Sequence, residues 1–120
     1  MTNSLPTIIS EYLAASERRD VDAIVATFAE DAVVVDEDKE WSGHAGIRKW
    51  RETVATAYEY TVEVRGVAAL GEVAGLERHD VYTHLEGNFP GGAVDLTMQF
   101  GLRGGRIATL QIVPTATAKA

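Results

Sequence analysis

The sequence lacks cysteine and is poor in basic residues. Without cysteine it can form no disulfide, no thiolate nucleophile and no cysteine-based zinc site. Its three histidines do not show HExxH-type spacing, so we expect no metal site. Eleven Lys and Arg against eighteen Asp and Glu give a formal charge of −7. Because a nucleic acid or an anionic membrane needs a basic surface, we expect neither as a partner.

A long apolar run is also missing. The first twenty residues have no basic start and no extended apolar segment, so they predict neither a signal peptide nor a membrane span. Together with the absence of cysteine, this favours a cytoplasmic location. The 120 residues, of which 46% are hydrophobic, fit one domain over residues 1–120, since they show no repeat, linker or low-complexity segment.

Three segments have the apolar spacing of amphipathic helices. They cover Pro6 to Glu17, Asp20 to Asp31, and the segment after Gly43. The charged residues of the third helix, Arg51 among them, are expected to face mostly water. The predicted buried faces carry Ile8, Ile9, Tyr12 and Leu13; Val21, Ile24, Val25 and Phe28; and Ile47, Trp50, Val54 and Ala57.

Short β-branched runs and period-two alternation predict strands. Residues 32–35 form a short apolar strand that leads into an acidic cluster from Asp36 to Glu40. From Tyr60 onward four longer strands form a meander. Because the helices come first and most strands last, we expect an α+β fold with three helices on one face of a curved antiparallel sheet. The expected strands are 60–70, 73–85, 93–103 and 106–114, with turns at Gly71, 87–92 and 104–105 and a frayed tail at 116–120.

Alternation also predicts which side chains face the helices. On the last two strands, Met98 and Leu110 belong to the covered set. The strand before them is less decisive, because one face carries His79 and Val81, the other carries His84, and a β-bulge would exchange the two histidines. The opposite face of the sheet is mixed but not strongly charged at its centre. We therefore expect a homodimer through this outer face.

The order of a helix hairpin, a short strand ending in Asp, a helix and a four-stranded meander resembles the family of nuclear transport factor 2, ketosteroid isomerase and the SnoaL-like polyketide cyclases. The segments that carry the resemblance are RRDVDAIVATFAEDAVVVD (residues 18–36), GHAGIRKW (residues 43–50) and GNFPGG with the strand after it (residues 87–103). The resemblance covers nearly the whole chain and implies an NTF2-like cone around an apolar pocket for a small ligand. Because that family contains enzymes of several kinds and non-catalytic proteins, it does not define a reaction.

Compared residue by residue with the ketosteroid isomerase motif, the sequence keeps part of the catalytic set. The resemblance implies that the general base is Asp36 and that the oxyanion-binding tyrosine of the first helix is Tyr12. The second acid of the isomerases falls on Met98, and two supporting tyrosines fall on Phe28 and Arg51. Because losing one oxyanion donor costs about 10²-fold or more in other enzymes, we do not expect efficient steroid isomerisation.

Two functions remain open. The first is a cofactor-independent isomerase, cyclase or dehydratase that acts on an apolar carbonyl substrate, with Asp36 as base and Tyr12 or His79 as hydrogen-bond donor. The second is a non-catalytic ligand-binding or dimerisation module, in which Asp36 merely opens a solvated loop and Tyr12 and His79 are structural. The predicted substrate-binding residues are Trp50, Phe28, Val81, Met98 and Leu110.

Overall fold

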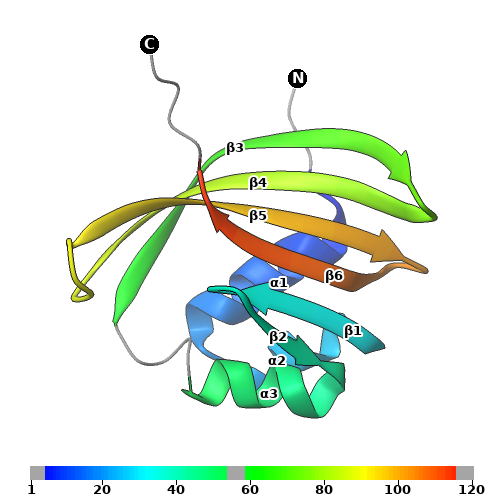
Figure 1. The fold of residues 1–120 in the computed structure, drawn as a ribbon, viewed down its shortest axis with the longest axis horizontal. Coiled ribbons are helices and arrows are strands. Elements are labelled where there is room, and N and C mark those ends of the chain that lie inside the picture. The colour runs from blue at the N-terminus through cyan, green and yellow to red at the C-terminus, as the bar shows by residue number, and fades with distance from the viewer. Residues whose placement is uncertain (1–4, 54–58, 116–120) are drawn as a thin grey trace.

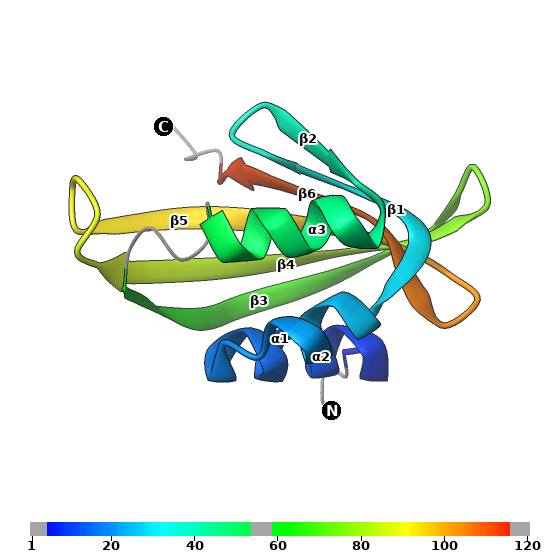
Figure 2. The same ribbon diagram turned by 90° about the horizontal axis from the view of Figure 1, so that it is seen from below.

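The computed structural model describes residues 5–53 and 59–115. Three helices lie on one face of a curved six-stranded sheet with the strand order β2-β1-β6-β5-β4-β3 (Figure 1 and Figure 2). This confirms the predicted α+β cone. The helices are α1 (Thr7–Arg18), α2 (Val21–Ala26) and α3 (Gly43–Thr53), and the strands are β1 (Phe28–Asp36), β2 (Lys39–Ser42), β3 (Tyr60–Val73), β4 (Leu76–Gly87), β5 (Ala93–Arg103) and β6 (Arg106–Pro114).

The local sequence explains where the first two helices begin and end. α1 starts directly after Pro6, whose ring fixes φ near −54°, and it is terminated by the capping residue Arg19, which has the left-handed conformation with φ 58°. Asp20 caps α2, because its side chain accepts a hydrogen bond from the Ala23 N–H at 3.1 Å. The two helices therefore form the expected hairpin, with Tyr12 on the buried side of α1.

α2 is shorter than its apolar pattern predicts. It ends at Ala26, and Phe28, which we expected on the helix, is the first residue of β1. Pairing with β6 competes with the helix here, since the Ile107 N–H donates to the Thr27 carbonyl at 3.0 Å and Phe28 pairs with Ile107. β1 runs parallel to β6, so the sheet is mixed rather than purely antiparallel.

The acidic segment after Asp36 is a tight turn rather than a long loop. Asp36 pairs with Lys39, and β2 runs antiparallel to β1. The two residues between them, Glu37 and Asp38, have positive φ values of 55° and 64°, as the central residues of a type I′ turn do. Sequence patterning missed β2, because a charged four-residue edge strand carries no apolar alternation. The turn fixes Asp36 at the end of a paired strand.

The four-stranded meander forms as predicted, with one turn displaced. β3 and β4 are joined at Ala74 and Gly75, which have φ values of 55° and 84°, and not at Gly71. Gly71 uses its positive φ of 80° within β3, at a register shift against β4. Glycine thus marks a bulge there, and the strand continues past it.

The core lies between the helices and the inner face of the sheet. Val81 and Leu110 are 0% and 1% exposed, so alternation predicted the inner faces of β4 and β6 correctly. The predicted helical positions Val54 and Ala57, and the predicted tail at 116–120, lie outside the described residues. Within the described ranges, no helix is long and apolar enough to cross a membrane. The largest fully buried side chains include Trp50, Tyr12, Phe28, Phe100, Ile9, Ile24 and Ile47.

Candidate active site

One end of the sheet's inner face is left open as a pocket. Its volume is about 1400 Å³, above the range of roughly 300–1,000 Å³ common for small-molecule sites. Residues of α1 and α3 form part of its wall, and the sheet contributes the apolar side chains of Leu85, Leu96, Met98 and Ile112. A pocket of this size and lining suits a ligand with more than one ring.

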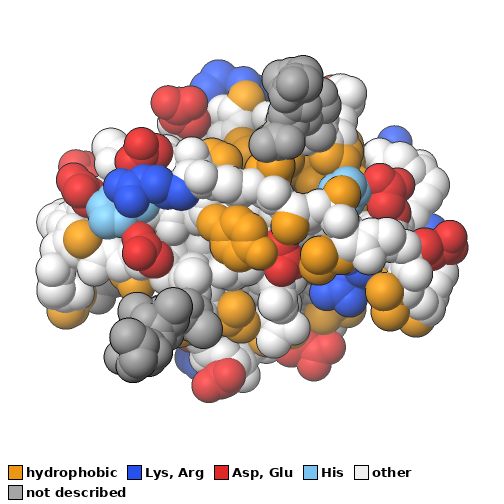
Figure 3. Space-filling view, turned by 90° about the horizontal axis from the view of Figure 1, so that it is seen from above, with side chains coloured by type: hydrophobic (Ala, Val, Ile, Leu, Met, Phe, Trp, Pro, Cys, Tyr) orange, Lys and Arg blue, Asp and Glu red, His pale blue; other side chains and the backbone are white. Residues whose placement is uncertain are grey.

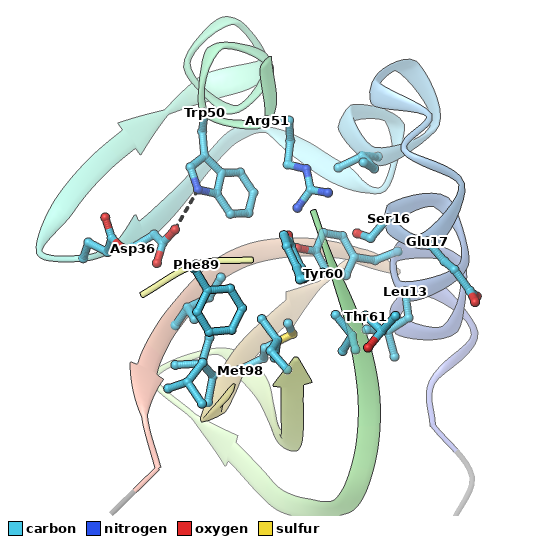
Figure 4. A pocket seen from close by; sticks show the side chains of 18 of the residues that line it. Leu13, Ser16, Glu17, Asp36, Trp50, Arg51, Tyr60, Thr61, Phe89 and Met98 are labelled. Atoms are coloured by element: carbon cyan, nitrogen blue, oxygen red, sulfur yellow. Dashed lines mark hydrogen bonds between the residues drawn. The ribbon is translucent and has the colours of Figure 1, made fainter. Parts of the chain in front are cut away.

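Asp36 enters the pocket from the last position of β1. Its side chain is half-buried, and the Trp50 Nε1–H donates a hydrogen bond to Oδ2 at 3.0 Å (Figure 4). Trp50 is 1% exposed, so the core holds the indole that positions the carboxylate. Among the described residues this is the only hydrogen bond that the Asp36 side chain accepts, which leaves Oδ1 available to a ligand.

Tyr12 lies where the packed core meets the pocket. Its ring meets Phe28 and Phe100 edge-on, with centroid distances of 5.7 and 5.6 Å, and the residue also lines the pocket. Burial raises the pKa of the Tyr12 phenol above its ordinary value of 10.0, while the Arg51 guanidinium acts in the opposite direction. The phenol is therefore protonated at neutral pH and can donate a hydrogen bond.

Arg51 turns into the pocket, so the predicted water-facing position is wrong for this residue. It is 7% exposed, and its Cζ lies 5.1 Å from the centre of the Trp50 ring. Figure 4 shows its guanidinium pointing from α3 toward Tyr60. Arg51 follows Ile47 by four residues, which puts it on the same helical stripe as Ile47 and Trp50. That spacing was the signal that could have revealed it.

The structure brings half of the predicted site residues to the pocket. Those that line it are Asp36, Tyr12, Trp50 and Met98. Those that pack in the core instead, outside the lining, are Phe28, Val81 and Leu110. Sequence reasoning missed several polar lining residues, among them Ser16, Arg51 and Tyr60. Tyr60 could have been found from its alternation with Val62 and Val64, which also line the pocket.

Neither strand histidine lines the pocket. His79 lies on the inner face of β4, but its Nε2 is 2.7 Å from Oε2 of Glu77, near the end of β4 that is remote from Leu85. His84 lies on the outer face, with Nδ1 2.6 Å from Asp95 and Nε2 2.9 Å from a Glu86 oxygen. The titratable groups that remain for chemistry in the pocket are therefore on other elements.

The polar lining of the pocket includes a carboxylate on β1, a neutral phenol on α1 and a guanidinium on α3. Such a set can remove a proton from carbon and stabilise negative charge that develops on a nearby oxygen. Within the part of the chain that the structure describes, no group of three or more His, Cys, Asp or Glu side chains is arranged to hold a metal ion.

The helices on one face of a curved sheet, with a pocket that opens inside it, define an NTF2-like α+β cone of the ketosteroid isomerase-like type. Within that class, the chain belongs to the SnoaL-like domain family, which matches residues 9–110. No curated protein matches the sequence significantly.

Solved structures agree with this assignment. Protein SMa1630 of Sinorhizobium meliloti, a provisionally assigned polyketide cyclase, is 36% identical over 91% of this chain and 95% of its own, with a TM-score of 0.83. SalBIII, an epoxide hydrolase/cyclase-like enzyme in pyran ring formation of the polyether salinomycin, is 25% identical over 91% and 88%, with a TM-score of 0.74. A hypothetical protein of Catenulispora acidiphila in complex with trimethylamine shares the fold at 19% identity over 93% and 88%, with a TM-score of 0.76.

Proposed function

We propose that the protein is a cofactor-independent small-molecule enzyme of the isomerase, cyclase or dehydratase type, with Asp36 as general base on an apolar carbonyl substrate. The observation that carries the proposal is the Asp36 carboxylate, which Trp50 holds at 3.0 Å inside a pocket that also contains the neutral Tyr12 phenol. A base and a hydrogen-bond donor in one apolar pocket are the groups that enolisation requires.

In the proposed mechanism, Asp36 takes the proton from a carbon next to the substrate carbonyl. The C–H bonding pair becomes the carbon–carbon double bond of an enolate, and the negative charge moves to the carbonyl oxygen. Tyr12 donates a hydrogen bond to that oxygen while Asp36 is protonated. The enolate then takes the proton back at another carbon, expels a β-hydroxyl that Asp36 protonates as water, or attacks a second carbonyl to close a ring. These three outcomes correspond to isomerase, dehydratase and cyclase.

The relatives are compatible with chemistry of this kind. The 36% identical Sinorhizobium protein is provisionally a polyketide cyclase, and SalBIII is described as cyclase-like in polyether ring formation. Polyketide intermediates are rich in acidic C–H bonds beside carbonyl groups, which is the site where a carboxylate base acts. The pocket, at about 1400 Å³, is large enough for such multi-ring compounds.

One observation favours the second candidate, a non-catalytic ligand-binding module. Met98 occupies the pocket position where the isomerase resemblance places a second acid, so the protein lacks that oxyanion donor. A binding module would keep the apolar pocket without turnover. The two candidates differ in what happens when the Asp36 carboxylate is removed.

The experiment is a turnover screen of β,γ-enones, β-hydroxy ketones and aromatic 1,3-diketones by liquid chromatography. For any compound that the wild type converts, Asp36→Asn is expected to lower kcat at least about 100-fold, because a general base contributes 10²–10⁴-fold. The matched control is Asp31→Asn, which makes the same change at an exposed position of β1, where Asp31 pairs with Arg103. Unchanged turnover in Asp36→Asn would mean that another group is the base.

The proposal includes a homodimer through the outer face of the sheet. Figure 3 shows that apolar side chains gather near the centre of this face, with charged and histidine side chains on both sides. Tyr82 is 36% exposed, and two buried polar atoms on this face, Arg78 Nε and Asp80 Oδ1, have no partner among the described residues. Light scattering should give a dimer for the wild type and a monomer for Tyr82→Arg, and a monomeric wild type would contradict the expectation.

A further inference from the structure

Arg51 is a buried cation without an anionic partner among the residues that the structure describes. It is 7% exposed, and among the described residues no carboxylate lies within 4.0 Å of its guanidinium and no acceptor is hydrogen-bonded to it. The guanidinium instead lies over the face of the Trp50 ring, with Cζ 5.1 Å from the ring centre. The Asp36 carboxylate, which also lines the pocket, accepts its hydrogen bond from Trp50 and not from Arg51.

The chemistry of arginine makes this arrangement costly. A guanidinium keeps its charge in proteins, so Arg51 cannot escape burial by losing its proton. A charge taken out of water without a counter-charge loses hydration that its surroundings must replace. The cation–π contact with Trp50 replaces part of that hydration. An apolar ligand that filled the pocket would exclude water from Arg51 and return no hydrogen bond, and a neutral carbonyl would return an acceptor without a counter-charge. An anionic ligand supplies both the acceptor and the counter-charge.

A second polar group lies beside Tyr12 in the same pocket. The Oγ of Ser16 is buried and makes no hydrogen bond of good geometry to the described residues, but it lies close enough to the Tyr12 phenol to lower that group's pKa. In Figure 4 the Ser16 hydroxyl and the Arg51 guanidinium point from α1 and α3 into the same part of the pocket. A carboxylate accepts hydrogen bonds at both oxygens, so one such group can satisfy both donors.

We propose that Arg51, assisted by Ser16, binds the carboxylate of an aromatic or multi-ring acid, so that the substrate of this site is a keto acid. The inference rests on the proposed function for the keto group and on Arg51 and Ser16 for the acid. The apolar body of the ligand would lie against Met98 and Leu96, and its reacting carbonyl would face Tyr12 and Asp36.

The rim of the pocket limits how much charge such a ligand can carry. Glu17, Glu37 and Asp38 line the pocket at exposed positions, and Arg19 is an exposed cation in the same lining. Exposed carboxylates repel a second negative charge at the mouth, while the buried guanidinium attracts the first at short range. The ligand class is therefore a monoanion with a large apolar part.

The test compares two probes of the same shape, 2-naphthoate and 2-naphthamide, by isothermal titration calorimetry. The wild type should bind the anion at least tenfold more tightly than the neutral amide. Arg51→Gln should remove this preference, and Arg51→Lys should keep part of it, because lysine keeps the charge but not the planar fork. Arg48→Gln is the matched control, since Arg48 lies on the same helix and pairs with the exposed Asp22 at 2.8 Å.

Equal binding of both probes by the wild type overturns the inference without any variant. Circular dichroism shows whether Arg51→Gln folds. If it does not, the test uses Arg51→Lys and the arginine Nε–H signals in the nuclear magnetic resonance spectrum of the wild type. 2-Naphthoate should then shift an arginine Nε–H signal that is absent from Arg51→Lys, and a lack of any shift contradicts the assignment. Asp36→Asn should lower turnover at least about 100-fold yet keep the preference for 2-naphthoate, so failure of the proposed base and failure of the anion site give different results.

Discussion

The inner face of the sheet is packed at one end and open at the other, although the same strands form both. At the packed end, Phe100 and Leu110 are 0% and 1% exposed, and Phe100 touches the Tyr12 ring. Two residues away on β5, Met98 lines the pocket, as does Leu96 beyond it. The difference shows that apolar alternation creates an inner face, while the placement of the helices over it decides which part becomes core and which part becomes lining.

Tyr12 marks the boundary between the two ends. Its ring packs on Phe28 and Phe100, and the residue also lines the pocket. The polar groups Asp36, Arg51 and Ser16 all line the open side. The packed end therefore supplies stability and fixed geometry, and the open end supplies chemistry.

The largest effect is expected from truncating matched leucines at the two ends. Leu110→Ala should lower the free energy of unfolding by about 3–5 kcal/mol, because it leaves a cavity in close-packed surroundings. Leu96→Ala removes the same atoms from a wall that already borders open space, so its loss should be about 1–2 kcal/mol. Urea unfolding of both variants measures the difference. Equal losses would show that the pocket end is packed as tightly as the core.

A second comparison concerns two glycines of the sheet. A Cβ added at Gly87 would overlap the backbone of Glu59 and Tyr60, where β4 approaches the start of β3 at the pocket wall. Gly87→Ala should cost about 1–3 kcal/mol through overpacking. Gly66→Ala is the control, because its Cβ would meet Tyr82 at an ordinary 3.5 Å. In thermal unfolding, the melting temperature should drop clearly for Gly87→Ala and change little for Gly66→Ala. An unchanged melting temperature of Gly87→Ala would contradict the close approach of the two strands.

Trp50→Phe separates positioning from stability at the open end. The change keeps an aromatic ring but removes the N–H that donates to Asp36, so we expect a loss of about 1–2 kcal/mol in unfolding free energy. The carboxylate would lose its fixed orientation, so kcat should fall about tenfold while KM changes little. Steady-state kinetics give both values. If the unfolding free energy falls but kcat does not, the hydrogen bond from Trp50 stabilises the fold without positioning Asp36 for catalysis.

The smallest effect is expected behind the open end, on the outer face. Hydrogen bonds to Asp95 and Glu86 raise the pKa of His84 above its ordinary 6.5, while the nearby Arg65 of β3 acts in the opposite direction. On the same neighbouring strand, Glu63 is the residue that lies opposite His84 in the strand register. Because the folded-state pKa is the higher one, protonated His84 stabilises the fold fully below pH 6.5. That contribution disappears as the pH rises through the folded-state pKa.

The melting temperature should therefore fall slightly over this pH window, and His84→Gln should flatten the profile. The effect is small because the cluster is exposed to solvent and screened. An unchanged slope in the variant would exclude His84 as the source of the pH dependence.

Most of the fold could be predicted from the sequence because its signals are local. Helical spacing located α1 and α3, and alternation located the meander and the inner faces that contain Val81 and Leu110. The errors arose where strand pairing with a distant segment competed with the local preference, because a short stretch of sequence does not reveal such pairing. Phe28 has helical spacing, yet its parallel pairing with Ile107 ends α2 early. β2 is visible only through its pairing with β1.

The candidate site was predicted in part. The family resemblance, laid on a strand end and a helical stripe, indicated Asp36 and Tyr12, and helical spacing indicated Trp50; all three line the pocket. Periodicity gives the face of a residue but not its position along the cone, so Val81 and Leu110 were expected in the lining and lie in the core. Arg51 was missed because charge suggested solvent, although its spacing from Ile47 indicated the buried side of α3.

The most direct test of the account is the exchange of the α-protons of 2-tetralone in deuterated water, followed by proton nuclear magnetic resonance. The wild type should accelerate the exchange over buffer, and Asp36→Asn should lower the catalysed rate at least about 100-fold. Asp31→Asn, on the same strand and paired with Arg103 at the surface, should exchange at the wild-type rate. Equal rates for the wild type and Asp36→Asn would contradict the central claim that Asp36 removes a proton from carbon at the open end of the sheet.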